Sequence, residues 1–481
     1  MPPKRARTQY PFRPMIRSPL DLAGEAARRY LDGLGDRCVA ATVSRADLIS
    51  RFDVPLGRAG IPAEQVVEEL IQAAEGGQLG NGSGRFFAWV IGGVLPSALA
   101  ADWLASTWDQ NAAIYATSPV SSVVEEIAGK WLLDVLRLPP TASFAFPTGC
   151  QMAHFTALAA ARQFLLDQVG WNVGEQGLAG SPPIRVLAST VRHVSVDRAL
   201  RYLGIGTRQI VVLPVDADGA ITPETLQAAL AEGAGPAIVA LNAADLNTGA
   251  FDPFSALIPI AREHGAWVHV DGAFGLFART SRRYDSLVEG MDLADSWATD
   301  CHKWLNAPQD CGFAAVRNSE AHRRAFTVHD SYFVGEQAAR DQIDWTPEWS
   351  RRARGFAVYA ALRELGRDGL AALVERNCDQ CHALVAGIGA LPGAEVVAPT
   401  HLNQGLVRFL DPRPEATPAD HDARTEKVIE AINASGEAFF GGVTWNGRRA
   451  MRISVVNWRI TEADVARTVA AVGRALAALS A

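Results

Sequence analysis

The chain has 481 residues, of which 48% are hydrophobic and 20% charged, and it carries a formal net charge of −7. This length is too great for one simple core and predicts two or more packed lobes. The acidic balance gives no reason to expect nucleic acid or an anionic membrane as a partner. No apolar run reaches the roughly 18 residues that predict a membrane-spanning helix, so we expect neither partner.

The N-terminus and the cysteines indicate the compartment. Residues 1–17 are basic, but no apolar segment follows them, as a secretory signal would require. Six cysteines in so long a chain do not indicate the disulfide framework of a secreted domain. We therefore expect a cytoplasmic protein with a solvated N-terminal tail.

Residues 1–90 are expected to form an N-terminal helical segment. Residues 20–75 have the pattern of two or three amphipathic helices, one of them starting at Ser44. Residues 76–84 are rich in glycine but lack the Gly-Lys-Ser/Thr of a P-loop, so a flexible loop is expected. Three aromatic residues follow this loop: Phe86, Phe87 and Trp89. They are either core or one wall of a substrate pocket.

From residue 143 to 375, short apolar runs alternate with helical stretches, which predicts a mainly parallel sheet covered by helices. The seven candidate strands are 143–146, 184–188, 209–213, 237–241, 267–270, 296–299 and 312–316. Helices are expected at 96–108, 119–138, 349–365 and 370–388. These elements predict an α/β fold with a large domain over residues 91–380.

A smaller C-terminal α+β domain is expected over residues 381–481. Strands are predicted at 405–410 and 451–456. Thr461 and Asp464 have the spacing of a capping box at the start of the last helix, which is expected to end near Leu479.

The strongest chemical signal is a buried acid followed by a His-Lys pair. The apolar run 267–270 ends at Asp271, and Lys303 follows about 30 residues later, after His302. A lysine can form a Schiff base with the aldehyde of pyridoxal 5′-phosphate (PLP), and a carboxylate can keep the pyridine nitrogen protonated. A lone His-Lys would more often be solvated charge, but both pieces at this separation predict a PLP site.

Two further segments fit such a site. Phe146-Pro-Thr-Gly-Cys-Gln-Met-Ala-His154 follows a strand and opens a helix, whose free N–H groups and dipole favour a phosphate. His193 lies just past a strand, where an imidazole could stack on the pyridine ring, although it could equally be an ordinary residue at a helix start. A polar loop, 242–252, follows another strand end.

These motifs resemble the group II PLP-dependent decarboxylases, which include the aromatic amino acid, glutamate and histidine decarboxylases. His269-Val-Asp-Gly-Ala273 resembles the family's His-Val-Asp-Ala-Ala, and Asp295-Ser296 followed by His302-Lys303-Trp304 resembles its Asp-Ser…His-Lys-Trp. Thr148-Gly-Cys-Gln-Met-Ala153 is similar to the phosphate loop in frame. The resemblance covers roughly residues 20–475.

The resemblance implies PLP fold type I and a homodimer with a shared active site, in which residues 1–90 pack on the partner. It implies that His193 and Ala273 lie on the two faces of the ring and that Asp271 and Lys303 hold it. It places the following residues round the phosphate: Cys150, Gln151, Ser296, Asp300 and His302. Tyr332, on a loop after the lysine, is the candidate that protonates the carbanion.

The resemblance further implies PLP-dependent decarboxylation of an L-amino acid through a Lys303 Schiff base, with no metal. The three aromatic residues 86, 87 and 89 weakly favour an aromatic substrate. An aldehyde synthase, an aminotransferase and a C–C lyase use the same atoms, and an inactive homologue acting as a binding protein is the alternative from another class. An arginine on the α-carboxylate would favour transamination, and four arginines are candidates: Arg351, Arg352, Arg354 and Arg452.

Three departures from the family pattern leave the substrate open. The phosphate loop has Cys150 and Gln151 in place of Gly-Ser/Thr, and Asp300 stands where an Asn is frequent. An acid near a phosphate needs a compensating donor. Asn247-Thr-Gly249 replaces the Gly-Thr-Thr of the animal enzymes and resembles a bacterial branch.

Overall fold

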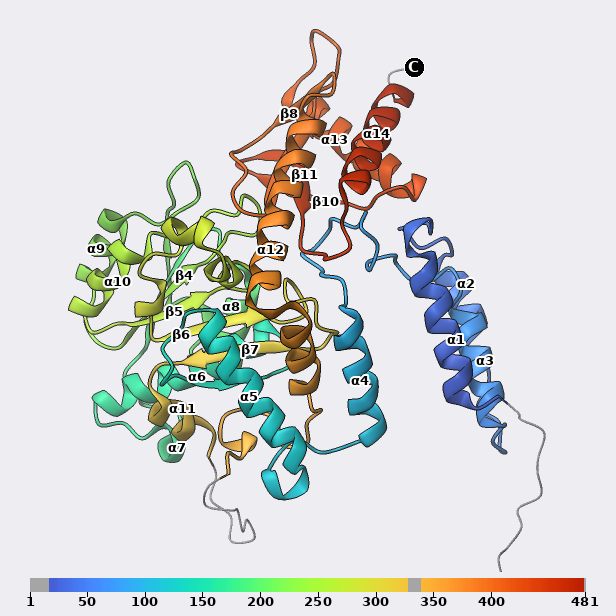
Figure 1. Ribbon diagram of the computed structural model, residues 1–481. Coiled ribbons are helices and arrows are strands. Elements are labelled where there is room, and N and C mark those ends of the chain that lie inside the picture. The colour runs from blue at the N-terminus through green and yellow to red at the C-terminus, as the bar shows by residue number, and fades with distance from the viewer. Residues whose placement is uncertain (1–16, 328–338, 480–481) are drawn as a thin grey trace, which may run out of the picture. The chain divides into compact units, whose positions relative to one another are not determined.

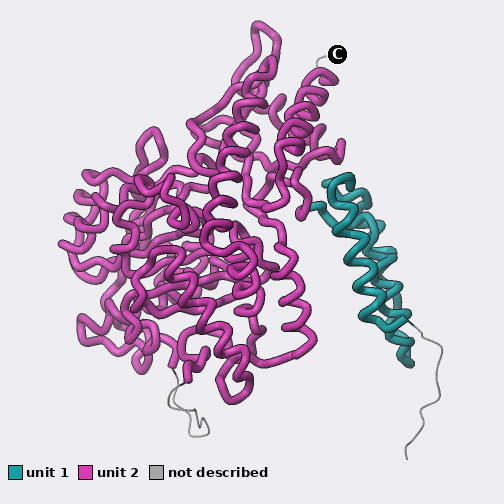
Figure 2. The backbone as a smooth tube through the Cα atoms, in the orientation of Figure 1, with its two compact units in different colours: residues 1–80 teal, residues 81–481 magenta. Residues whose placement is uncertain are grey.

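The computed structural model describes residues 17–327 and 339–479. The chain divides into two compact units, Met1–Gly80 and Asn81–Ala481, which Figure 2 colours separately. The boundaries expected at residues 90 and 380 remain predictions. Within the described ranges, no helix is both long and apolar enough to cross a membrane.

The first unit consists of three helices: α1 (Pro19–Asp32), α2 (Arg45–Phe52) and α3 (Ala63–Ala74). Helices α1 and α2 begin with capping boxes, in which Ser18 and Ser44 exchange hydrogen bonds with the acid three residues later. The helix start expected at Ser44 is therefore confirmed. Neither α2 nor α3 contains a fully buried residue, so their apolar faces stay largely uncovered.

The second unit is built on a seven-stranded sheet of order β1-β7-β6-β5-β4-β2-β3 (Figure 1). The strands are β1 (Ser143–Ala145), β2 (Arg185–Ser189), β3 (Ile210–Leu213), β4 (Ala237–Asn242), β5 (Trp267–Asp271), β6 (Ser296–Asp300) and β7 (Gly312–Val316). Strands β3, β2, β4, β5 and β6 are parallel neighbours, and β7 is antiparallel to β6 and β1. The expected strands and the mainly parallel α/β class are confirmed.

Helices cover both faces of this sheet. Alternate side chains of a strand point to opposite faces, so each face packs on its own set of helices. On β4, Val239 and Leu241 belong to an apolar cluster with residues of α5, α9, α10 and α12, whereas Ile238 and Ala240 belong to a cluster with α6 and α8. In this second unit, the α-helices that precede α12 are α4 (Pro96–Trp108), α5 (Pro119–Val135), α6 (Cys150–Gln168), α7 (Val173–Gln176), α8 (Val194–Tyr202), α9 (Pro223–Ala231), α10 (Phe254–Glu263) and α11 (Ser319–Phe326).

Helix α12 (Gly355–Gly389) connects the large sheet to the C-terminal sheet (Figure 1). It breaks at Gly366, whose φ of 61° is a left-handed conformation that glycine adopts without strain. The break separates the two helical stretches that the sequence predicted. The start expected at Trp349 is wrong, because residues 349–354 form an irregular segment whose arginines bond to other parts of the chain.

The C-terminal part contains an antiparallel sheet of order β10-β11-β9-β8. Its elements are β8 (Ala394–Val396), β9 (Gln404–Phe409), α13 (Pro418–Ser435), β10 (Gly441–Trp445), β11 (Arg448–Ser454) and α14 (Glu462–Ala478). The sequence predicted β9 and β11, which are central, and missed β8 and β10, which are edge strands with less buried surface. Thr461 and Asp464 form the expected capping box of α14.

Candidate active site

Three strands end in polar side chains at one edge of the large sheet. β4 ends at Asn242, β5 at Asp271 and β6 at Asp300, and Asn242 pairs with Asp271 across the two strands. Every residue of these three strands is buried, and Asn242 and Asp271 line a cavity at this edge. Open α/β sheets bind ligands beyond the carboxyl ends of their strands, so this edge is the candidate site.

A cavity lies at this edge and draws its walls from distant parts of the chain. The residues that matter for its chemistry are Trp89, His193, Asp271, Ala273, Lys303 and Arg452. The first five of these were predicted from the sequence as site residues. The fold therefore brings the predicted acid, lysine and two ring neighbours together.

Asp271 is the buried acid of the cavity. Its Oδ1 accepts a hydrogen bond from the backbone N–H of Ala273 (3.1 Å), and its Oδ2 lies 3.5 Å from Nε2 of His154. Burial alone would raise the pKa of this carboxyl, but His154, His193 and Lys303 outweigh burial and hold its pKa well below the ordinary value. Asp271 is therefore an anion at neutral pH.

Lys303 follows β6 on a tight turn. Its Nζ lies 3.1 Å from Oδ2 of Asp300, and 5.9 Å from the centre of the Phe274 ring. A Cβ atom on Gly92 would lie 2.1 Å from the carbonyl oxygen of Lys303, so the segment that packs on this turn requires a glycine there. Burial lowers the pKa of the Lys303 amine, but Asp300 and the other nearby anions outweigh it, so the pKa is raised overall.

The N-terminus of α6 carries the residues expected round a phosphate. The backbone N–H of Cys150 donates to Oδ1 of Asp300 (2.5 Å), and Nε2 of His302 lies 3.4 Å from the same oxygen. Nδ1 of His302 accepts from the backbone N–H of Cys311 (3.3 Å), so Nε2 carries the hydrogen in the neutral ring. The side-chain nitrogen of Gln151 is buried without a hydrogen-bond partner among the described residues. This corner suits an anion.

His193 is the N-cap of α8, which explains its position at the cavity wall. Its Nδ1 accepts a hydrogen bond from the backbone N–H of Ser195 (3.3 Å) and lies 2.7 Å from the Ser195 hydroxyl. The capping bond fixes the ring where the strand β2 gives way to the helix. The imidazole therefore starts a helix, as one reading of the sequence predicted, and it also lines the cavity. Its stacking on a pyridine ring stays a prediction.

Three predicted site residues lie elsewhere. Phe86 stacks on Phe439 (ring centres 5.2 Å apart) and Phe87 is fully buried against Phe440, so both are core and only Trp89 reaches the cavity. Ser296 shares a face of β6 with Asp300 but lies four residues earlier, about 13 Å along a strand. Its hydroxyl bonds to other side chains.

Another predicted site residue, Tyr332, falls outside the described residues. Its expected part in protonation therefore stays a prediction.

Arg452 is the cavity residue that the sequence left unassigned. The other three candidate arginines are engaged away from the cavity: Arg351 with Glu125, Arg352 with Asp102 and Arg354 with Asp310. Arg452, on β11 of the C-terminal sheet, lines the cavity with Lys303 and Asp271. Only its contact across the fold distinguishes it from the other three, so no local pattern could have selected it.

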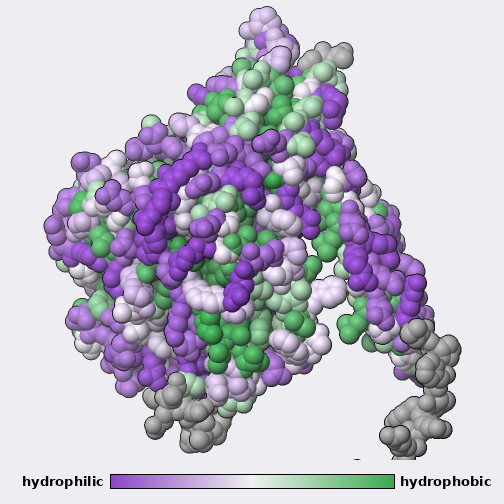
Figure 3. Space-filling view, viewed as in Figure 1, coloured by the Kyte–Doolittle hydropathy of each residue, from purple (hydrophilic) through white to green (hydrophobic). Residues whose placement is uncertain are grey.

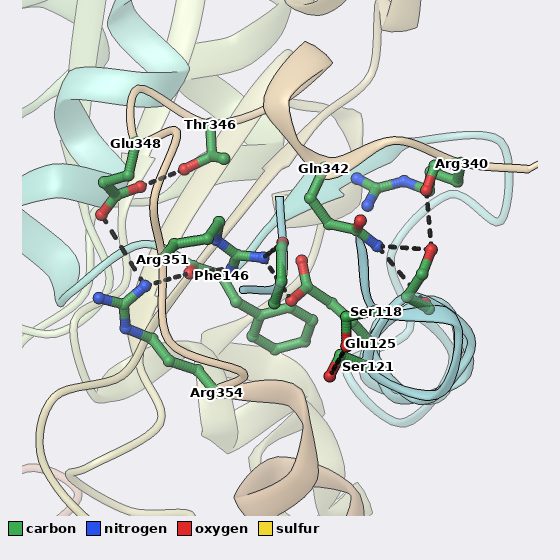
Figure 4. A network of polar contacts seen from close by, with 12 residues as sticks. Ser118, Ser121, Glu125, Phe146, Arg340, Gln342, Thr346, Glu348, Arg351 and Arg354 are labelled. Carbon is green, nitrogen blue, oxygen red and sulfur yellow. Dashed lines mark hydrogen bonds and ion pairs between the residues drawn. The ribbon is translucent and has the colours of Figure 1, made fainter. Parts of the chain in front are cut away.

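A network of polar contacts holds the chain just before the α6 N-terminus (Figure 4). Arg351 donates from Nη2 to the carbonyl oxygen of Phe146 (2.9 Å) and pairs through Nη1 with Glu125 (2.7 Å). Arg354 also donates to the Phe146 carbonyl (3.4 Å). Phe146 lies four residues before Cys150, so this network fixes the loop that leads to the anion-binding corner.

Comparisons with known proteins agree with this geometry. A family model described as the pyridoxal-dependent decarboxylase conserved domain matches residues 63–410, well over half of the chain. The chain is 29% identical over 387 residues to an L-2,4-diaminobutyrate decarboxylase of Rhizobium meliloti (strain 1021), covering 78% of this chain and 74% of that protein. It is 27% identical over 389 residues to an aromatic-L-amino-acid decarboxylase of Bacillus atrophaeus, covering 79% and 78%.

A solved structure shows the same fold. The crystal structure of Oryza sativa TDC with PLP and tryptamine matches with a TM-score of 0.89 and 22% sequence identity, over 98% of this chain and 100% of that one. The expected type I architecture, a seven-stranded sheet with a smaller C-terminal domain, is therefore confirmed.

Proposed function

Since this chain belongs to the pyridoxal-dependent decarboxylase family and is a PLP-dependent amino acid decarboxylase, we propose that Lys303, Asp271 and Arg452 carry its reaction. The observation that supports this assignment is their meeting in one cavity from three separate parts of the chain. When bound there, PLP supplies an electron sink for the electrons of the bond that breaks at the substrate's Cα.

The residues of the cavity fit this cofactor. Lys303 offers the amine and Asp271 the anion for the ring nitrogen, with His193 and Ala273 as the proposed ring contacts. For the phosphate we propose the α6 N-terminus with three side chains: Cys150, Gln151 and His302. The unpartnered buried amide of Gln151 supports this choice, because a buried donor without an acceptor costs about 1–3 kcal/mol.

Asp300 is the one group at this corner that opposes an anion. Its carboxylate accepts the Cys150 N–H and contacts Lys303 and His302. A phosphate that uses the same donors competes with it, so we propose that Asp300 limits cofactor affinity. The released Lys303 amine then loses the anion that raises its pKa, which favours its neutral, nucleophilic form.

We propose that Arg452 receives a carboxylate of the substrate. Burial lowers the pKa of its guanidinium, and Asp245 partly offsets the shift, yet an arginine stays charged at neutral pH. Val90 and Phe274 form apolar walls beside it and exclude water from the bound carboxylate. Lys303 then holds the proton that Cα must receive after CO₂ leaves, with Tyr332 as the second proposed donor.

The position of Arg452 also leaves transamination as an alternative reaction. An arginine on the α-carboxylate would hold the bond that decarboxylation breaks, and would favour transamination instead. An arginine on a side-chain carboxylate would not. The aldehyde synthase and C–C lyase alternatives rest on the shared cofactor alone.

For the substrate side chain we propose packing on Trp89. This indole is 52% exposed and lines the cavity, in contrast to Phe86 and Phe87. An acidic side chain would place its methylene groups on this indole and its carboxylate on Arg452, the arrangement that permits decarboxylation. An aromatic or long apolar side chain would also cover the indole, but it would leave Arg452 to the α-carboxylate, the arrangement that favours transamination. The relatives named above as L-2,4-diaminobutyrate and aromatic-L-amino-acid decarboxylases differ greatly in substrate side chain. The incubation with twenty amino acids described below identifies the substrate.

We propose a homodimer with a shared active site in the cytoplasm. Large apolar side chains are exposed on α4, α5 and the segment before α12: Trp103, Leu104, Trp108, Val120, Val123 and Trp349. Figure 3 shows a hydrophobic area near α5, and such patches typically mark interfaces. The uncovered faces of α2 and α3 support the proposal that residues 1–90 pack on the partner.

Cytoplasmic placement is supported by the cysteines. All six are free, and five of them are buried. A reducing compartment preserves buried thiols of this kind.

The first test removes the amine of Lys303. We expect Lys303→Ala to lose turnover by at least about 10³-fold and to lose the visible absorbance of the bound cofactor. Holoenzyme is incubated with each of the twenty amino acids while CO₂, amine, keto acid and peroxide are measured.

The matched control is Lys427→Ala, because Lys427 is exposed on α13 and does not line the cavity. It should keep full turnover. Retained absorbance in Lys303→Ala would contradict the assignment of this lysine, and keto acid without CO₂ would replace decarboxylation by transamination.

A further inference from the structure

Behind Asp271, buried polar side chains form a continuous chain from α6 into the sheet. Nε2 of His154 lies 3.5 Å from Oδ2 of Asp271, and Nδ1 of His154 lies 2.9 Å from Nε2 of His269. Nδ1 of His269 lies 2.9 Å from the hydroxyl of Ser296, which accepts from Nε1 of Trp267 at 2.9 Å. All five side chains are buried.

The two ends of this chain fix its direction. An indole N–H can only donate a hydrogen bond, and an ionised carboxylate can only accept one. Trp267 therefore donates to Ser296, and His154 Nε2–H donates to Asp271. Between them, Ser296 donates to Nδ1 of His269, and Nε2–H of His269 donates to Nδ1 of His154. In this arrangement every hydrogen has an acceptor, and all bonds point toward Asp271.

The opposite arrangement fails at Ser296. A doubly protonated His154 would donate to His269 as well, which would turn the His269 Nδ1–H toward Ser296. The Ser296 oxygen would then receive two hydrogens, and its own hydrogen would have no acceptor among the described contacts. A buried polar group without a partner costs about 1–3 kcal/mol, so the one-way arrangement is favoured.

The surroundings of His269 agree with a neutral ring, because burial lowers its pKa to about 3. The titratable groups that face Asp271 from other elements include His193 and Lys303. Cys150 Sγ lies 3.4 Å from Nε2 of His154 and is a weak second acceptor.

Cys150, His154 and Asp271 also bring three metal-ligand atoms within 4.8 Å of one another. Both ring nitrogens of His154 are engaged in hydrogen bonds, so these residues already have partners without a metal ion.

From these contacts we propose that His154 is a positioning residue for Asp271. Together with His269, Ser296 and Trp267 it directs one N–H at the carboxylate, which keeps Asp271 ionised and aimed at the ring nitrogen of the cofactor. This role rests on the proposed function of Asp271. It also gives Ser296 a task different from the phosphate contact that the family resemblance implied.

The tautomers provide the first test, and they need neither cofactor nor substrate. Apoenzyme labelled with ¹⁵N-histidine is titrated through the pH range near 6.5 where an ordinary histidine gains its proton. We expect His269 to remain neutral with its hydrogen on Nε2, and His154 to carry the Nε2–H tautomer at neutral pH. We also expect Ser296→Ala to change the Nδ1 signal of His269. An imidazolium signal or an Nδ1–H tautomer at His154 at neutral pH would overturn the proposal.

The second test compares two substitutions of His154. His154→Leu keeps much of the volume but no donor, and we expect it to weaken cofactor binding about 10–100-fold, as removing the outer partner of a metal ligand does. It should also shift the pH titration of the cofactor's visible absorbance. His154→Gln retains a donor and an acceptor, and should recover most of the affinity.

Equal behaviour of the Leu and Gln variants would show that His154 only fills space, and would overturn the proposal. If His154→Leu fails to fold, the tautomers of the native apoenzyme and of Ser296→Ala still decide. Correct tautomers in an enzyme that releases no CO₂ would overturn the proposed function while leaving the hydrogen-bond chain established.

Discussion

Two clusters of buried charge flank the loop between β1 and α6, and they differ in what their charged groups contact. On the Phe146 side, Arg351 and Glu125 are 0% and 2% exposed, and the arginine also donates to two backbone carbonyls (Figure 4). On the Cys150 side, Asp271 and Lys303 face a cavity. The first cluster finds its partners within the chain, whereas the second keeps binding capacity for a ligand.

This difference separates a structural role from a functional one. A buried ion pair with both partners present holds segments in register, although it adds little net stability over apolar packing. Charged groups with shifted pKa values that line a cavity are instead candidates for binding a ligand or for catalysis. The comparison can be tested by removing one group from each cluster.

The largest loss of stability is expected when Arg351 is replaced. Arg351→Met leaves Glu125 buried without its partner and should lower the free energy of unfolding by about 3–5 kcal/mol, measured by urea denaturation. Adding Glu125→Leu removes the stranded charge, so the double variant should recover most of the loss. A single variant that loses less than about 1 kcal/mol, the range of an exposed pair, would show that the network is not structural.

The functional cluster should respond in the opposite way. Asp271→Asn removes the anion beneath the proposed ring nitrogen and should lower kcat/KM by about 10²–10³-fold, as the loss of one preorganised electrostatic contact does. Its unfolding free energy should change less than that of Arg351→Met. A variant that keeps its turnover but unfolds more easily would reverse the roles of the two clusters.

The last comparison concerns the pH dependence of stability. Burial lowers the pKa of His322 to about 3, and nearby Arg340 adds to the shift, whereas the hydrogen bond to the Trp345 carbonyl opposes it. The unfolded state binds a proton below pH 6.5 that the folded state refuses, so the free energy of unfolding falls as the pH drops from about 6.5 to 3.

Replacing His322 by Gln should therefore flatten this fall by about 1.4 kcal/mol per pH unit. Urea denaturation at several pH values measures the slope. His269, whose pKa burial also lowers to about 3, is the matched position behind the cavity. If replacing His322 or His269 by Gln leaves the dependence of the unfolding free energy on pH unchanged, the buried neutral state of these two rings is contradicted.

The sequence determined the parts of this protein that depend on local pattern. Runs of four or five residues marked all seven strands of the large sheet, and Ser44 and Thr461 marked helix starts through capping boxes. Motif spacing was enough to predict that Asp271 and Lys303 share a site, because consecutive parallel strands carry their ends to the same edge.

Tertiary structure alone decided which long-range partners complete the site. Arg452 differs from three other arginines in lining the cavity from the C-terminal sheet. Phe86 and Trp89 both contact Phe439, but Phe86 is buried there, whereas Trp89 stays exposed and lines the cavity. His154, His269 and Ser296 meet because β5 and β6 are in register and α6 lies across them. Sequence periodicity records which face of an element is buried, but not which distant side chain that face meets.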